Sequence, residues 1–291
     1  MGHSKGIRIE LNPPIKSDEV PGYYAKVEPL LMRTSLVSLT SHHANGLTGF
    51  ERSLNLIKYI RSVREDPIDI LVHLTCRDVD RASLLSKLQQ LEGENVSRLL
   101  LLSGENYIGS TSSDTEFKNS TELLEEIVSR KFNTRFESLA IAGFPGGNRL
   151  SSNNNLEEYA RLASRLQTGA IDTIYTQCIF DYEEFDKFAG TVKRHLESDI
   201  DIIPSVALFK DLKSLERVVR LTRVQNNVAN LRSLSESIDE KHARKLCTTY
   251  LTNLCKSFLS ADHQVNLCLF GQVDLAREIL DEIAGRYNDK E

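Results

Sequence analysis

One acid, Glu10, stands in a short apolar segment near the start of the chain, Ile7–Leu11, which is followed by Pro13 and Pro14. Apolar and polar residues alternate in this segment, which is typical of a β-strand. Proline ends the strand because it fixes φ and has no N–H to donate. An acid at the C-terminal end of a first strand is where a (β/α)8 barrel carries catalytic groups. By itself the segment is more often a solvated strand end, so its interpretation depends on the rest of the chain.

Polar groups also follow other apolar runs of the sequence. They are Thr40 with His42 and His43, His73 with Thr75, Ser103-Gly104-Glu105, Phe144, Thr176 with Gln177, and Asp181. If the runs are barrel strands, these groups meet at one mouth, although His73 could equally be a core histidine and Gln177 a loop contact. Adjacent histidines rarely chelate one ion together, so we expect no metal site. The chain has neither a P-loop nor a G-x-S-x-G elbow.

Apolar runs and amphipathic stretches alternate along the chain. We predict strands at Ile7–Leu11, Leu36–Thr40, Ile68–Leu74, Ser97–Leu102, Leu139–Ala142, Ile171–Gln177, Ile200–Pro204 and Val265–Phe270. We predict helices at Phe50–Arg64, Ala82–Leu91, Thr121–Lys131, Leu156–Thr168, Tyr182–Leu196, Asp211–Arg223 and Val273–Tyr287. Parallel strands need helical crossovers, so the pattern predicts an α/β fold, a (β/α)8 TIM barrel. A doubly wound sheet is the alternative, which the lack of a G-x-G-x-x-G after the first strand disfavours.

We expect residues 1–291 to form a single barrel domain. Residues 1–6 would be a loose lead-in, and residues 233–260 a helical insertion before the last strand, with a helix from near Ile238. The length and the 40% hydrophobic content suffice for one large core.

The net charge of −5 argues against a nucleic-acid binder. The five cysteines are scattered without a C-x-x-C motif, which indicates buried thiols in a reducing compartment. Neither a membrane-spanning run nor a signal-peptide core is present, so a cytoplasmic location is expected.

Taken together, the strand ends resemble the methylenetetrahydrofolate reductase family. The matching segments are Ile9-Glu10-Leu11-Asn12-Pro13-Pro14, His73-Leu74-Thr75-Cys76, Leu102-Ser103-Gly104-Glu105 and Thr176-Gln177-Cys178-Ile179-Phe180-Asp181. The family has Phe-Glu-Phe-Phe-Pro-Pro, His-Leu-Thr-Cys, Leu-Arg-Gly-Asp and Thr-Gln-Phe-Phe-Phe-Asp in the same order. The resemblance spans nearly the whole chain, and the family fold is a (β/α)8 barrel.

The resemblance implies reduction of a methylene group on tetrahydrofolate, or on a folate-like pterin, to a methyl group. NADH or NADPH would reduce bound FAD, which would then reduce the folate. Glu10 would be the general acid, Glu105 would adjust the charge near the flavin and the pterin, and Gln177 would bind the substrate. The positions that would hold FAD are Thr40, His73, Leu102, Gly104, Ala142, Phe144, Glu158 and Arg165.

The chain departs from the family mostly at cofactor and folate contacts. Ser103 replaces an arginine, Ser41 an aromatic residue and Ser164 a basic one, while Asn148, Ser214 and Val218 replace a histidine, a glutamine and a phenylalanine. Three alternatives therefore stay open. One is direct hydride transfer to a folate-like or methanopterin-type carrier without flavin. Another is a degenerate barrel that serves as a subunit or regulator of a true reductase, and the third is an unrelated barrel lyase. A homo-oligomer is compatible with the resemblance.

Overall fold

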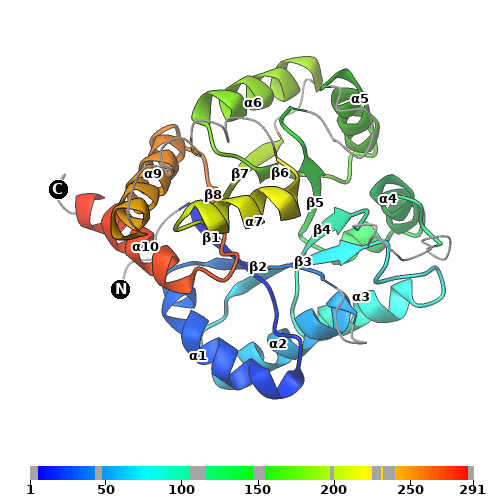
Figure 1. The fold of residues 1–291 in the computed structure, drawn as a ribbon. Helices are drawn as coiled ribbons and strands as arrows, with labels where there is room; N and C mark the ends of the chain where they lie inside the picture. The colour runs from blue at the N-terminus through cyan, green and yellow to red at the C-terminus, as the bar shows by residue number, and fades with distance from the viewer. Residues whose placement is uncertain are drawn as a thin grey trace.

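A closed barrel of eight parallel strands forms the centre of the computed structural model, which describes residues 6–42, 48–104, 116–146, 155–196, 200–224, 231 and 240–287. Each strand pairs with the next in the sequence, and β8 pairs with β1 (Figure 1). The strands are β1 (Ile7–Leu11), β2 (Leu36–Leu39), β3 (Asp69–Thr75), β4 (Arg98–Leu102), β5 (Ser138–Gly143), β6 (Thr173–Cys178), β7 (Asp201–Ala207) and β8 (Val265–Cys268). The predicted (β/α)8 fold is therefore confirmed.

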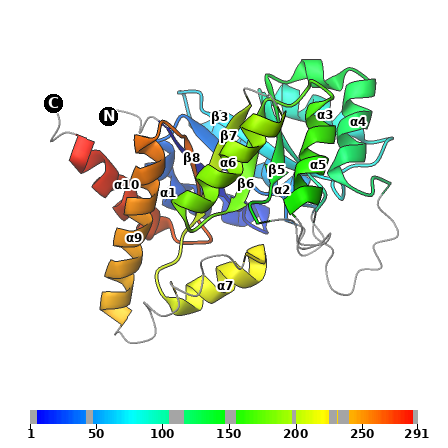
Figure 2. The same ribbon diagram turned by 90° about the horizontal axis from the view of Figure 1, so that it is seen from above.

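Helices surround the barrel in sequence order (Figure 1). They are α1 (Val20–Leu31), α2 (Gly49–Val63), α3 (Leu84–Gly93), α4 (Ser120–Ser129), α5 (Asn155–Leu166), α6 (Tyr182–Leu196), α7 (Leu212–Thr222), α9 (Glu240–Ser260) and α10 (Val273–Tyr287), with short 3-10 turns η1 (Ser17–Glu19) and η3 (Phe132–Arg135). Figures 1 and 2 show that α7 does not join the ring and lies across one end of the barrel. This end is the one at which the strands finish. In the described part of the chain, no helix is both long and apolar enough to cross a membrane.

Helix α1 is an element that the sequence pattern did not predict. It contains Pro21, Gly22 and Pro29, residues that normally argue against a helix. Pro21 lies in the first turn, where the missing N–H would have had no helical partner anyway. Buried Val27, Leu30 and Leu31 hold the helix on the barrel, so packing overrides the propensity.

Strand β7 also differs from its predicted range, because it continues past Pro204 to Ala207. Proline cannot donate to a ladder and is tolerated in a sheet at bulges. The pairing of β6 with β7 shows such an irregularity, since Tyr175 pairs with Ile203 and Cys178 with Ser205. Two residues of β6, Thr176 and Gln177, thus lie opposite Pro204. The bulge changes the direction of the strand end that carries Gln177.

Side chains inside the barrel form a buried apolar layer beneath the mouth. This layer, here called the barrel floor, consists of Leu36, Leu71, Leu100, Ala140, Tyr175 and Ile203. Arg8 crosses this level and donates hydrogen bonds to the Tyr175 hydroxyl and to Gln264. The alternate residues of each strand face outward and pack under the helices in the main core, as expected for a parallel barrel.

Gly143, the last residue of β5, packs so closely that it has no room for a side chain. A Cβ there would lie 2.7 Å from Ile174 Cγ2 and 2.9 Å from Phe188 Cζ. We expect Gly143→Ala to destabilise the fold by about 1–3 kcal/mol through overpacking. Gly190 in α6 is the matched control, because nothing lies within 4 Å of its added Cβ. Gly190→Ala should stabilise the helix by about 0.5–1 kcal/mol. Urea unfolding of both variants checks this, and equal effects would contradict the packing argument.

Candidate functional site

Glu10 lies near the C-terminal end of β1 with its carboxyl group inside the barrel mouth, and its side chain is 17% exposed. Asn266 Nδ2 on β8 donates a hydrogen bond to Glu10 Oε2 at 2.9 Å. His73 Nε2 on β3 lies 3.8 Å from the same oxygen. The Cys268 thiol, also on β8, is a further hydrogen-bond partner of this carboxyl group. The carboxyl group is therefore anchored in the mouth by side chains of β8.

His73 is buried inside the barrel beside Glu10. Its Nε2 lies 2.8 Å from Ser38 Oγ on β2, which fixes the ring. Burial lowers the pKa of His73 below its ordinary value of 6.5, and the neighbouring Glu10 only partly opposes this shift. His73 is thus a neutral group at neutral pH. It leaves the negative charge of an ionised Glu10 uncompensated.

The lowered pKa of His73 predicts a pH dependence of stability. Below pH 6.5 His73 becomes protonated more readily in the unfolded chain than in the folded chain, because its pKa is lowered by folding. The free energy of unfolding therefore falls as the pH falls. Above that value the contribution of His73 is fully present. We expect the stability difference between wild type and His73→Gln to be flat above about pH 6.5 and to decline below it, by at most about 1.4 kcal/mol per pH unit. Urea unfolding across this range measures it, and a difference independent of pH would contradict the burial argument.

Thr40 and Asn12 link the ends of β2 and β1. The Thr40 hydroxyl donates to Asn12 Oδ1 at 3.3 Å, and Arg52 of α2 also donates to Asn12 Oδ1. Arg52 is buried and makes further hydrogen bonds to the carbonyls of Pro13, Pro14 and His42. Thr40 therefore lies at the mouth as predicted, on a rim that one arginine holds together.

Asp78, just after β3, fixes the rim on its other side. Its Oδ2 accepts hydrogen bonds from Ser41 Oγ at 2.6 Å, Thr75 Oγ1 at 2.7 Å and Thr75 N at 2.9 Å. Its Oδ1 accepts from Phe50 N at 3.0 Å, in the first turn of α2. The carboxylate is buried and well hydrogen-bonded, so it is a structural acid that aligns three segments.

The end of β4 carries Leu102, whose partner in the ladder is Thr75 of β3. Gly104 follows with φ of +82°, a conformation that favours glycine. Between them, the Ser103 hydroxyl accepts a hydrogen bond from Ser120 N and so holds the start of α4. The predicted acid Glu105 lies outside the described residues, as do His43 and Asn148.

A second group of predicted residues lies between β5 and α5. Ala142 pairs with Tyr175 on β6, and after it Phe144 N donates to Glu158 Oε1 at 3.0 Å. Glu158 is buried and forms an ion pair with Arg161, whose guanidinium lies over the Phe144 ring. Arg165, one turn further along α5, is also buried.

These two arginines carry charge into a setting that is buried for Arg165 and partly buried for Arg161. Arg165 Nε donates to Thr121 Oγ1 at 2.9 Å, and Arg161 Nε has no hydrogen-bond partner in the described part of the chain. Burial lowers the pKa of Arg161 to about 10, with Arg165 contributing, and that of Arg165 to about 10. Both side chains remain cations at neutral pH. The pair can therefore receive an anionic group.

Gln177 is half-buried on the bulged end of β6. Its Oε1 accepts a hydrogen bond from Cys178 N at 2.8 Å, which occupies the acceptor end of the amide. Among the described residues, Nε2 has no partner. Gln177 thus offers a donor, which suits a carbonyl oxygen on a ligand.

The structure joins only some of the predicted site residues directly. Glu10 and His73 lie side by side in the mouth, and Phe144 N donates a hydrogen bond to Glu158 of α5. The other predicted site residues that the structure describes lie at separate positions on the rim. The sequence pattern did not indicate Asn266, Ser38 or Arg161 as site residues. A usable signal existed for Asn266, because it is the one polar residue in the apolar run Val265–Phe270.

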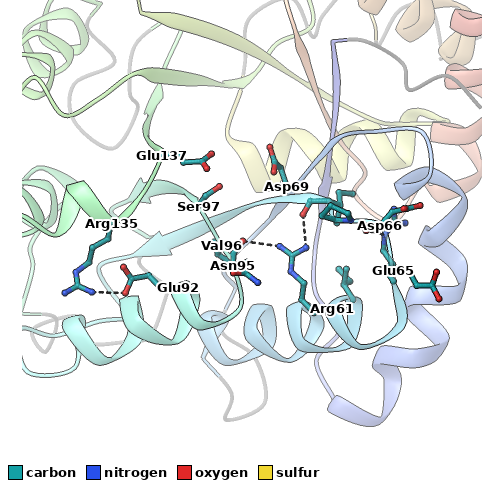
Figure 3. Close-up of a pocket in the computed structure, with 14 residues that line it drawn as sticks. Arg61, Glu65, Asp66, Asp69, Glu92, Asn95, Val96, Ser97, Arg135 and Glu137 are labelled. Atoms are coloured by element: carbon teal, nitrogen blue, oxygen red, sulfur yellow. Dashed lines mark hydrogen bonds and ion pairs between the residues drawn. The ribbon is translucent and has the colours of Figure 1, made fainter.

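A surface cavity of about 660 Å³ lies at the opposite end of the barrel (Figure 3). Its lining includes Arg61, Asp69, Glu92, Arg135 and Glu137, from the starts of β3 and β5 and the helices beside them. Arg61 donates to the carbonyls of Ile68, Glu94 and Asn95, and Arg135 pairs with Glu92. These contacts serve the fold, since barrel enzymes carry their chemistry at the C-terminal ends of strands.

The fold and the mouth together define a (β/α)8-barrel protein with an anchored acid at the end of its first strand. The chain belongs to the methylenetetrahydrofolate reductase family, whose family model matches residues 3–284. The predicted family is thereby confirmed.

Two curated relatives are similar over most of the chain. Methylenetetrahydrofolate reductase 2 of Schizosaccharomyces pombe is 25% identical over 247 residues, which is 81% of this chain and 35% of the relative. A probable methylenetetrahydrofolate reductase (NADPH) of Caenorhabditis elegans is 22% identical over 282 residues, 94% of this chain and 42% of the relative. The chain thus spans less than half the length of these relatives.

Solved structures share the fold at low sequence identity. A protein from Clostridium thermocellum, described as binding two copies of 5-methyl-5,6,7,8-tetrahydrofolic acid, superposes with a TM-score of 0.62 at 11% identity, covering 96% of each chain. The tryptophan synthase alpha-subunit of Pyrococcus furiosus gives 0.52 at 9% identity, covering 96% of this chain and 98% of its own. These likenesses concern the barrel itself.

Proposed function

We propose that this chain reduces the methylene group of a methylene-tetrahydrofolate, or of a similar pterin, to a methyl group. The observation that carries the proposal is the carboxyl group of Glu10, anchored through Oε2 in the barrel mouth of a member of this family. The similarity to two methylenetetrahydrofolate reductases supports it, as does the folate bound by the Clostridium thermocellum barrel.

Glu10 would act on the five-membered ring of the substrate. The bond between the methylene carbon and a ring nitrogen breaks, the electron pair stays on the nitrogen, and the proton on Glu10 Oε1 moves to it. An unprotonated amide ion is a poor leaving group, so a positioned acid accelerates this step. Gln177 Nε2 would orient the ligand by donating to a carbonyl of the pterin or the nicotinamide, and Glu105 is proposed as a second acid near the reacting rings.

The residues between β5 and α5 fit a phosphate-bearing cofactor such as FAD. Arg165 is a buried cation and Arg161 a partly buried one, and Arg161 Nε lacks a hydrogen-bond partner among the described residues. An Arg guanidinium pairs with phosphate bidentately, and a bound anion would offset the cost of burying these charges. Bound FAD would supply hydride transfer from NADH or NADPH to the folate. His73, Thr40, Leu102, Gly104, Ala142, Phe144 and Glu158 are proposed to border it.

The proposed activity is tested by product formation. The purified chain is incubated with methylene-tetrahydrofolate and NADH or NADPH, with and without added FAD, and methyl-tetrahydrofolate is measured by mass spectrometry. Product that requires FAD supports the full proposal, and product without flavin supports direct hydride transfer. No methyl product under any of these conditions would refute the reductase activity and favour a non-catalytic role.

Flavin binding offers a separate prediction on Arg165. We expect Arg165→Met to weaken FAD binding about ten- to hundredfold, because one charge-assisted contact with phosphate is lost. Riboflavin, which has no phosphate, should bind equally to wild type and variant. Fluorescence titration of both ligands gives the comparison. An equal loss of affinity for FAD and riboflavin would indicate that the variant disturbs the fold, and it would contradict a phosphate contact.

A further inference from the structure

Asn266 is a buried amide on β8 whose side chain contacts the proposed acid. Barrel closure puts β8 beside β1, where Glu10 pairs with Cys268 in the ladder and Arg8 with Asn266. From its position the Asn266 side chain reaches up the barrel, and Nδ2 lies 2.9 Å from Glu10 Oε2. The residue is 1% exposed, so this contact is shielded from water. A hydrogen bond to an ionised group is stronger in such surroundings.

The other contacts of this amide are weaker and fall on the same nitrogen. Nδ2 lies 3.3 Å from Ser205 Oγ and 3.6 Å from Cys268 Sγ. The carbonyl oxygen, Oδ1, is buried and has no hydrogen-bond partner in the described part of the chain. Leaving a buried acceptor unpaired is costly, and an apolar side chain of the same size would avoid that cost. The packing of β8 alone does not account for an asparagine here.

The N–H end of the amide matches Glu10 Oε2 in both protonation states of the acid. In the carboxylate Oε2 is an anionic acceptor, and when the proton lies on Oε1 it is the carbonyl oxygen of the neutral acid, which also accepts a hydrogen bond. The Nδ2 donor can therefore hold Glu10 Oε2 before and after proton transfer from Oε1. His73, neutral and 3.8 Å from that oxygen, adds no competing charge.

We propose that Asn266 is the positioning residue for Glu10, holding Oε2 in both protonation states so that Oε1 faces the substrate. This inference rests on the proposed function, because it requires Glu10 to deliver a proton. It assigns a role to a residue of β8 that lies 256 positions from its partner in the sequence.

The experiment compares three variants of Asn266 in the chain assayed with methylene-tetrahydrofolate, NADPH and FAD. Asn266→Leu keeps the volume without a donor, and Asn266→Asp keeps the shape and replaces the donor by an acceptor. Asn266→His restores an N–H at the position of Nδ2. We expect kcat for methyl product to fall about ten- to hundredfold in the first two variants and to recover in the third. KM for the folate should change little, and oxidation of NADPH by a quinone should be unaffected.

A double variant separates positioning from folding. If Asn266 acts through Glu10, then Glu10→Gln with Asn266→Leu should be no slower than Glu10→Gln alone. Additive losses, or a full kcat in Asn266→Asp, would overturn the inference while the reductase activity of the wild type stands. Absence of methyl product from the wild type would overturn both proposals. If Asn266→Leu does not fold, the same comparisons are made with Asn266→Asp and Asn266→His.

Discussion

Glu10→Gln is expected to lower the rate of methylene-tetrahydrofolate reduction by about 10²–10⁴-fold, because the variant cannot supply a proton to the leaving nitrogen. Glutamine keeps the size of the side chain, and its amide oxygen can take over the hydrogen bond from Asn266 Nδ2. The geometry of the mouth should therefore persist. Stopped-flow measurement of methyl product formation gives the rate.

The control for Glu10→Gln is the oxidation of NADPH by a quinone acceptor, a reaction without ring opening. We expect it to continue at a rate close to that of the wild type if FAD is bound. The thermal unfolding temperature should change little, since removal of a charge from a partly buried mouth leaves no cavity. A variant that still forms methyl product at the wild-type rate would remove Glu10 from the mechanism.

Asp78→Ala is expected to cause the largest loss of stability, about 2–5 kcal/mol, because it leaves several buried donors without an acceptor. The backbone N–H groups of Thr75 and Phe50 and the hydroxyl of Ser41 all depend on this carboxylate. Their release would also loosen the rim that carries Thr40. Guanidinium unfolding measures the loss.

Asp80, two residues further on, is the matched control. It accepts a hydrogen bond from Ser83 N but is fully exposed to solvent. Asp80→Ala should therefore have a much smaller effect than Asp78→Ala. Equal losses in the two variants would show that burial of the Asp78 carboxylate does not matter.

The barrel could be predicted from the sequence because each strand is a short apolar run followed by an amphipathic stretch. Two helices, Tyr182–Leu196 and Val273–Tyr287, were predicted to the residue. Helix α1 could not be predicted from the sequence, since its two prolines and its glycine obscure the helical period. Strand β7 was predicted too short for a related reason, because Pro204 is accommodated by a bulge that only the pairing reveals.

Only those site residues that lie at the ends of predicted strands could be predicted from the sequence. Position in the sequence placed Glu10 and His73 at the mouth, but it could not reveal that Asn266 holds Glu10, because that contact exists only once β8 closes on β1. Arg161 was missed because its role depends on burial beside Phe144, which depends on the packing of α5. The roles of Glu10, Gln177 and the predicted cofactor residues stay predictions.

The barrel floor has a consequence for the route by which Glu10 would regain a proton if it acts as the proposed acid. Beneath the mouth lie Leu36, Leu71, Leu100, Ala140, Tyr175 and Ile203. The Tyr175 hydroxyl, whose pKa is raised by burial, lies at this level and accepts a hydrogen bond from Arg8. If the chain turns over as proposed, the mostly apolar floor would leave the mouth as the route by which a proton reaches Glu10, and the product would leave by the same opening. A slowly released product would in that case also delay the next proton.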